Sequence, residues 1–290
     1  MSVLDAAGIG IGPFNLSLAA LLDREPAIQT RFFERAPKFA WHPGLLFPEA
    51  TVQVSFLKDL VTLVDPTNRH SFLAFLAAHK RLYRFINANF SRITRREFNQ
   101  YLQWVCNSLA PVLSFGTEVA SVDFDGHSFV VLTANAAVRA RNIVLGTGLT
   151  PLIPECARRH LAGSVFHATR FLSSGVDYAN RAVAVVGGGQ TGAEVVLHLL
   201  NRNPLPARVE WITRRSNFLA LDESAFVNDM FSPGYSERFF GLPQPQRLRL
   251  LREHKLASDG ISASLLEQIY RRLYELEFIE HEGQIGRAHV

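Results

Sequence analysis

The 290-residue sequence predicts an α/β fold with two Rossmann-like dinucleotide-binding domains. Two glycine-rich turns, at residues 10–15 and 187–192, each stand between an apolar run and a helical pattern, and a second apolar run of strand character follows each helix. In such units the glycines let the backbone bend and approach a pyrophosphate, while the helix N-terminus offers free N–H groups. Two units in one chain predict two bound dinucleotides, most simply a flavin and a nicotinamide that exchange a hydride.

The first unit comprises a strand at residues 3–9, a helix with apolar residues at spacings of three and four, and a strand at residues 31–33. The turn residues predicted to bind the dinucleotide are Gly10, Gly12, Pro13 and Asn15. Glu34 follows the second strand, about 22 residues after Gly12, where an acid can accept hydrogen bonds from both ribose hydroxyls of an adenosine. The alternative is that Glu34 only ends the strand in solvent.

The middle of the chain changes from a helical to a strand pattern. Residues 71–109 place aromatic and aliphatic side chains at helical spacings, and residues 119–132 alternate as strands around a turn at 125–126. Residues 141–148 form a predicted buried strand that runs into a Gly-Thr-Gly turn. Such a strand and turn commonly close the first half of a flavin domain.

The second unit has a strand at residues 181–186 and another at 209–213. The residues of its turn that are predicted to bind the second dinucleotide are Gly187, Gly189, Gln190 and Gly192. Its second strand ends at Arg214 and Arg215, where the first unit has an acid. A guanidinium binds a 2′-phosphate through charge-assisted bonds and an acid repels it, which predicts NADP(H) rather than NAD(H). The alternative is two surface arginines without a ligand.

The segment after these arginines is predicted to be loop-rich and to build a substrate pocket. The segment at residues 215–260 is longer than a connection between a strand and a helix needs to be. It contains the helix breakers Pro233, Gly234, Gly241, Pro243, Pro245 and Gly260. Residues 261–276 then predict an amphipathic helix.

The pattern predicts an FAD-binding domain at residues 1–165 and an NADPH-binding domain with the pocket loop at 166–283. Residues 284–290 are expected to be a non-native tail, because this heptapeptide can be read by translating a common sequencing adaptor. We expect the natural protein to continue further, since a two-dinucleotide fold normally returns to its flavin domain.

Composition excludes several other classes of protein. Hydrophobic residues make up 48% and charged residues 19%, as in a globular chain with a sizeable core. The formal charge is only +4 and the arginine pairs are scattered, which argues against a nucleic-acid surface. Cys106 and Cys156 are far apart, which argues against a disulfide framework, a zinc site or a redox dithiol. No apolar run reaches the roughly 18 residues of a membrane span and no signal peptide is evident, so we expect a cytoplasmic protein.

Seven phrases in order resemble the lysine/ornithine N-monooxygenase family of siderophore-pathway flavin monooxygenases. They lie at residues 8–16, 41–44, 53–60, 83–85, 97–102, 187–194 and 258–262. The resemblance covers residues 3–278 and implies FAD in the first unit and NADPH in the second. It also implies O2 and an amine as substrates: the amine attacks a C4a-hydroperoxyflavin, and the hydroxylamine later becomes a hydroxamate siderophore for iron acquisition. The protein then acts by positioning, with no catalytic side chain and no metal.

The resemblance assigns further site residues. Gln53, Trp41 and His42 are expected to lie beside the flavin. Lys58 is expected to meet the substrate, its ammonium facing an α-carboxylate, and Asn228 and Ser258 are expected to hold substrate. Without the motif, Lys58 would be a surface lysine with a buried stem, Asn228 a turn residue and His42 a structural histidine.

The phrase at 258–262 looks like the lysine-hydroxylating branch, so L-lysine is the expected substrate. Putrescine or cadaverine, and ornithine, stay open as alternatives. So does a nucleotide-binding fragment without turnover, and a homo-oligomer is left open as well. A disulfide reductase is set aside, because neither cysteine has a neighbouring thiol.

Overall fold

The computed structural model describes residues 3–280 and 286–289 of the chain. The chain divides into two compact units, unit 1 (Met1–Arg159) and unit 2 (His160–Val290), each described below by itself. From the sequence the division was expected after residue 165. Each unit contains a sheet with a parallel βαβ crossover at a glycine-rich turn, so both have the Rossmann-like α/β architecture expected from the sequence.

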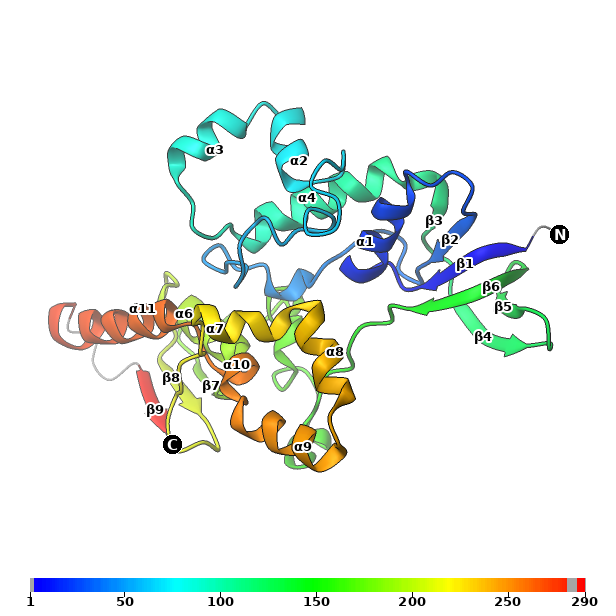
Figure 1. Cartoon of the computed structure of the whole chain (residues 1–290). Coiled ribbons are helices and arrows are strands. Elements are labelled where there is room, and N and C mark those ends of the chain that lie inside the picture. The colour runs from blue at the N-terminus through cyan, green and yellow to red at the C-terminus, as the bar shows by residue number, and fades with distance from the viewer. Residues whose placement is uncertain (1–2, 281–285, 290) are drawn as a thin grey trace. The chain divides into compact units, whose positions relative to one another are not determined.

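The sheet of unit 1 has six strands in the order β3-β2-β1-β6-β5-β4, with β1 between β2 and β6 (Figure 1). β1 pairs in parallel with both neighbours, whereas β4, β5 and β6 form an antiparallel meander. The bounds are β1 Leu4–Ile9, β2 Thr30–Phe33, β3 Leu113–Ser114, β4 Val119–Phe124, β5 Phe129–Thr133 and β6 Ala137–Leu145. The glycine turn therefore leaves the carboxyl end of a strand with parallel neighbours on both sides, where α/β sheets bind their ligands.

Helices pack an aromatic core against this sheet. Their bounds are α1 Pro13–Leu22, α2 Phe72–Ala78, α3 Leu82–Ala88 and α4 Arg95–Ser108. The short α5 (Glu155–Arg158) has no buried residue. Ser71 and Thr94 cap α2 and α4 with side-chain oxygens, which explains where these helices begin. Leu16, Phe72 and Tyr101 are completely buried in the core that α1, α2 and α4 share.

Unit 2 is built on a three-stranded parallel sheet in the order β7-β8-β9. The bounds are β7 Ala182–Val186, β8 Arg208–Ile212 and β9 Gly286–His289. α6 (Gln190–Leu200) packs against α11 (Ala263–Tyr274), which buries Leu199, Leu265 and Ile269. α11 continues as a π-helical turn at Glu275–Ile279.

The prediction of a loop-rich segment at 215–260 was wrong, because four short helices occupy most of it. They are α7 Ala225–Asn228, α8 Pro233–Gly241, α9 Gln244–Glu253 and α10 Leu256–Asp259. Pro233 and Pro245 lie in the first turns of α8 and α9, where a missing N–H is harmless, and Gly241 ends α8. The proline and glycine residues therefore separate helices instead of preventing them.

The segment at 284–290, expected to be a non-native tail, falls partly outside the described residues. Residues 284, 285 and 290 are not described, and residues 286–289 form β9 in parallel with β8. Strand pairing uses backbone groups that almost any sequence supplies. The pairing therefore does not bear on the origin of these residues, which stays a prediction.

Candidate functional site

The first glycine turn is held by close backbone contacts. Gly10 has φ +89°, and a Cβ there would come within 2.3 Å of the Gly146 carbonyl oxygen. The buried Asn15 side chain donates to the Gly10 carbonyl oxygen at 2.8 Å, and a Cβ on Gly146 would meet that same amide. Pro13 is in the first turn of α1. Gly10, Pro13 and Asn15 thus determine the shape of the turn, in addition to their predicted role in binding the dinucleotide.

Gly12 differs from Gly10, because the fold does not require glycine there. It has φ −93° and ψ −178°, which other residues adopt easily, and it stands immediately before α1. Within the described part of the chain, no neighbouring atom lies within 4 Å of where a Cβ would be. A glycine at a helix N-terminus beside open space fits the close approach of a phosphate.

Glu34 lies at this same turn. One carboxylate oxygen accepts from the Ile11 amide at 3.0 Å and the other from the Ala36 amide at 2.9 Å. The strand end predicted to carry a ribose-binding acid is therefore beside the glycine turn, and the structure shows the contacts that hold the acid there.

Residues 41–60 carry the four other predicted site residues of unit 1. Trp41 is half-buried, with its ring centroid 5.4 Å from that of Phe98, whereas His42, Gln53 and Lys58 are exposed. Partial desolvation, and then the positive charge of Arg95, lower the pKa of His42 below its usual range. The imidazole is therefore neutral near pH 7 and suits a stacking or hydrogen-bonding role better than an ionic one.

The second glycine turn repeats the pattern of the first. A Cβ on Gly192 would come within 2.1 Å of the Gly187 carbonyl oxygen, which also accepts a hydrogen bond from the Trp211 indole at 2.9 Å. Gly189 has φ −114° and stands before α6, with no described atom within 4 Å of a Cβ position. Gly189 therefore corresponds to Gly12.

The Gln190 side chain, predicted to bind cofactor, takes part in an internal network. Its Nε2 donates to Glu194 at 2.9 Å, and its Oε1 accepts from the Ser262 amide at 2.9 Å and from the Ser262 hydroxyl at 3.2 Å. This network connects the nucleotide turn to the phrase at 258–262. No role for Glu194 or Ser262 was expected from the sequence, although both occur in the phrases that carried the family resemblance.

The two arginines after β8 differ in their surroundings. Arg215 donates to the Asp259 carbonyl oxygen at 2.6 Å and lies 3.6 Å from its carboxylate, so it braces the phrase at 258–262. The Arg214 side chain is exposed. Of the two, Arg214 is therefore better placed to bind a phosphate from solution.

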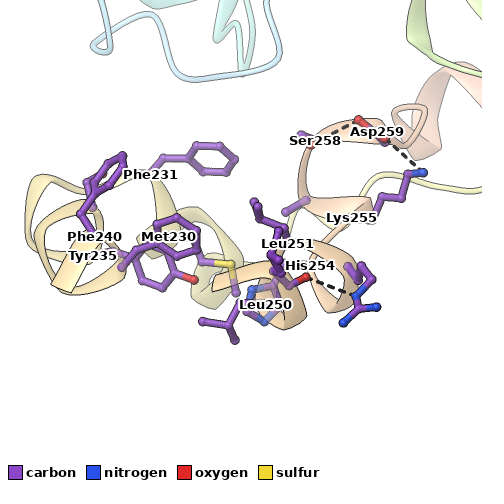
Figure 2. Close-up of a pocket in the computed structure, with 15 residues that line it drawn as sticks. Met230, Phe231, Tyr235, Phe240, Leu250, Leu251, His254, Lys255, Ser258 and Asp259 are labelled. Carbon is purple, nitrogen blue, oxygen red and sulfur yellow. Dashed lines mark hydrogen bonds and ion pairs between the residues drawn. The ribbon is translucent and has the colours of Figure 1, made fainter. Parts of the chain in front are cut away.

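The predicted substrate residues Asn228 and Ser258 are exposed in unit 2, whereas Lys58 belongs to unit 1. Asn228 ends α7 and donates to the Glu223 carbonyl oxygen at 3.3 Å. Ser258 is on α10 and bonds Asp259 at 3.4 Å. It lines a 740 Å³ cavity between α8, α9 and α10 whose walls are largely aromatic and aliphatic (Figure 2).

Residues 3–280 and 286–289 contain no group of three or more His, Cys, Asp or Glu side chains that could hold a metal ion. None of the helices among them has the length and apolar character that crossing a membrane requires.

Residues 2–286 match the family described as L-lysine 6-monooxygenase/L-ornithine 5-monooxygenase. The chain belongs to this family. It is 43% identical over 274 residues to the L-lysine N6-monooxygenase of Escherichia coli, with 93% of this chain and 64% of that protein covered. The chain thus spans less than two thirds of the length of this relative.

Solved structures of similar monooxygenases have the same fold. The FAD-bound cadaverine monooxygenase DfoA of Erwinia amylovora matches with a TM-score of 0.92 and 31% identity, covering 99% of this chain and 69% of that one. The ornithine N-hydroxylase KtzI of Kutzneria sp. 744, solved with reduced FAD, NADP+ and L-ornithine, matches with a TM-score of 0.90 and 35% identity, covering 99% and 71%. The expectation of a flavin-monooxygenase-like α/β fold is confirmed.

Folding stability tests whether the first turn requires glycine at position 10 but not at position 12. Gly10→Ala should lower the free energy of unfolding by at least about 2 kcal/mol, because alanine is strained at φ +89° and collides with backbone. Gly12→Ala is the matched control and should cost about 1 kcal/mol or less. Urea denaturation of the purified chain measures both. Equal losses would show that Gly12 also serves the fold.

Proposed function

We propose that this chain supplies the FAD- and NADPH-binding parts, and part of the substrate site, of a monooxygenase that hydroxylates the side-chain amine of L-lysine for siderophore biosynthesis. The observation that carries the proposal is the pair Gly12 and Gly189. Each stands at a helix N-terminus with an ordinary φ and open space in front of it. The fold does not require glycine at either position. A pyrophosphate that binds the helix N–H groups does require it, because it must approach the backbone closely.

The first turn suits the FAD pyrophosphate and adenosine ribose. The α1 N-terminus would face the phosphates at Gly12, and the Glu34 carboxylate beside the turn would accept from ribose hydroxyls. Trp41, His42 and Gln53 would line the flavin ring. When bound, FAD supplies the redox chemistry that activates oxygen, and the chain positions the reactants and excludes water.

The second turn suits NADPH. The α6 N-terminus would take its pyrophosphate at Gly189, and the exposed Arg214 would bind the 2′-phosphate. Arg215 is committed to Asp259 and would support Arg214 by holding the neighbouring segment in place.

L-lysine is the proposed substrate, with Lys58 facing its α-carboxylate and Asn228 and Ser258 offering polar contacts. The 43% identity to the lysine enzyme of E. coli supports this choice. A diamine is the second candidate, since the structure with a TM-score of 0.92 is that of a cadaverine monooxygenase. A diamine has no carboxylate for the Lys58 ammonium to meet, which favours lysine.

A comparison of amines tests the function. The purified protein is supplied with FAD, NADPH and oxygen, and hydroxylamine formed from L-lysine, L-ornithine, putrescine and cadaverine is measured against NADPH consumed. We expect the highest coupled rate with L-lysine. A higher coupled rate with a diamine would show that the diamine, and not L-lysine, is the substrate. A protein that takes up no FAD would be a fragment without turnover.

A variant of Arg214 tests which nicotinamide nucleotide the second unit binds. Arg214→Asp should change the ratio of kcat/KM for NADPH over NADH by at least about tenfold in favour of NADH, because the charge-assisted bonds to the 2′-phosphate are replaced by repulsion. Arg215→Ser is the control and should change this ratio less. An unaltered preference in Arg214→Asp would place the phosphate elsewhere.

A variant of Lys58 tests whether this side chain binds the amine substrate. Lys58→Ala should raise KM for L-lysine by about tenfold or more, the cost of a lost ionic hydrogen bond, and should leave NADPH-driven flavin reduction without amine unchanged. Stopped-flow absorbance of the flavin and steady-state hydroxylamine assays separate the two. An unchanged KM would remove Lys58 from the site.

A further inference from the structure

The segment that carries Gln53 and Lys58 has little regular structure to hold it. Between the 3₁₀ turn at Pro43–Leu45 and the start of α2 at Phe72, the described chain forms neither helix nor strand apart from a single bridge at Thr51. Lys58 itself is exposed, and its backbone N–H donates to the Ser55 carbonyl oxygen at 2.9 Å. The position of its ammonium therefore depends on what fixes the adjacent backbone.

Asp59, the next residue, makes an unusually complete set of contacts. One carboxylate oxygen accepts from the Val61 amide at 2.9 Å and the Thr62 amide at 2.7 Å. The other accepts from the Thr62 hydroxyl at 2.8 Å and the Phe72 amide at 2.6 Å. Hydrogen bonds to an ionised acceptor are stronger than neutral ones, so this one side chain closes its own turn and ties it to the start of α2.

The residues beside Asp59 extend this attachment into the core. The Leu60 amide donates to the Tyr101 hydroxyl at 3.3 Å, and the Leu60 carbonyl oxygen accepts from Ser17 on α1. Tyr101 is completely buried and donates to the His70 carbonyl oxygen at 2.7 Å. Burial, and then the nearby charge of Asp59, raise the pKa of Tyr101, so its hydroxyl keeps the proton that it donates.

Packing holds the other side of Lys58. The Phe56 ring lies edge-on to Phe85 at 5.1 Å between centroids and 5.8 Å from Phe72. Lys58 thus lies between an aromatic anchor two residues before it and a hydrogen-bonded anchor one residue after it. A long lysine side chain loses less entropy on meeting an anion when its backbone is already fixed.

We infer that Asp59 is a positioning residue for the amine site: its carboxylate holds the backbone that presents Lys58, and it acts through Lys58 without touching substrate. This inference rests on the proposed role of Lys58. Both Asp59 oxygens are committed to residues 61, 62 and 72, and in the described part of the chain no ion pair joins Asp59 to Lys58. Its effect is therefore on backbone geometry and not on the charge of the ammonium.

Asp59→Asn tests the inference, with Asp65→Asn as the matched control. Asparagine keeps the size of the side chain but cannot accept on both sides, so a bond to Thr62 or Phe72 is lost. Asp65 is in the same segment and also accepts several bonds, from Thr67 and Asn68, besides an ion pair with Arg24. We expect Asp59→Asn to raise KM for L-lysine about tenfold with kcat within about threefold, and Asp65→Asn to leave both within about twofold.

Amide hydrogen exchange without any ligand supplies the second measurement. Asp59→Asn should speed exchange at residues 61, 62 and 72, whereas Lys58→Ala should raise KM without this effect. Faster exchange with an unchanged KM for L-lysine, while Lys58→Ala raises it, would overturn the inference and leave the proposed function standing. If Lys58→Ala does not raise KM, or L-lysine is not turned over, the proposed function fails and the positioning role fails with it.

Thr62→Val tests the same contact if Asp59→Asn does not fold. It removes only the hydroxyl bond to Asp59 and retains the three amide bonds. KM for L-lysine should rise about threefold, and rescue by Thr62→Ser should restore it, because serine returns the hydroxyl. No change in Thr62→Val would overturn the inference.

Discussion

Both nucleotide units depend on a close approach of backbone that only glycine permits. At the first turn Gly10 meets the backbone of Gly146, and at the second Gly192 meets the carbonyl oxygen of Gly187. The first contact packs the turn after β1 against the turn after β6, and the second packs the start of α6 against the turn after β7. In each unit the carboxyl end of a strand and the N-terminus of a helix, with its free N–H groups, meet at the glycine turn. The two pyrophosphate sites proposed above lie at these two turns.

The same comparison separates two kinds of glycine. Those that a Cβ would drive into backbone serve the fold, whereas Gly12 and Gly189 meet nothing in the described structure and have ordinary backbone angles. Sequence spacing treats all of them alike, because a glycine pattern does not record what lies opposite each Cα. The distinction therefore points to the ligand more directly than the motif does.

Hydrogen bonds connect the helices that follow the glycine turns to the segments that contain the proposed substrate residues. In unit 1, Ser17 on α1 and Tyr101 on α4 hold Leu60, next to Asp59 and Lys58. In unit 2, Gln190 at the start of α6 holds Ser262, close to Ser258 in sequence. In each unit, the helix that follows a glycine turn is also hydrogen-bonded to a segment proposed to meet substrate.

The sequence by itself determined the α/β class, the two glycine turns, the strand–helix–strand unit around each turn and the family, because periodicity, glycine spacing and local phrases are local properties of the chain. It did not determine the helices at 215–260, where prolines begin helices that a breaker count treats as loop. Nor did it separate Arg214 from Arg215, or reveal that Gln190 faces Ser262 and that Asp59 reaches Phe72. Those contacts join residues distant in sequence, so only the tertiary structure could decide them.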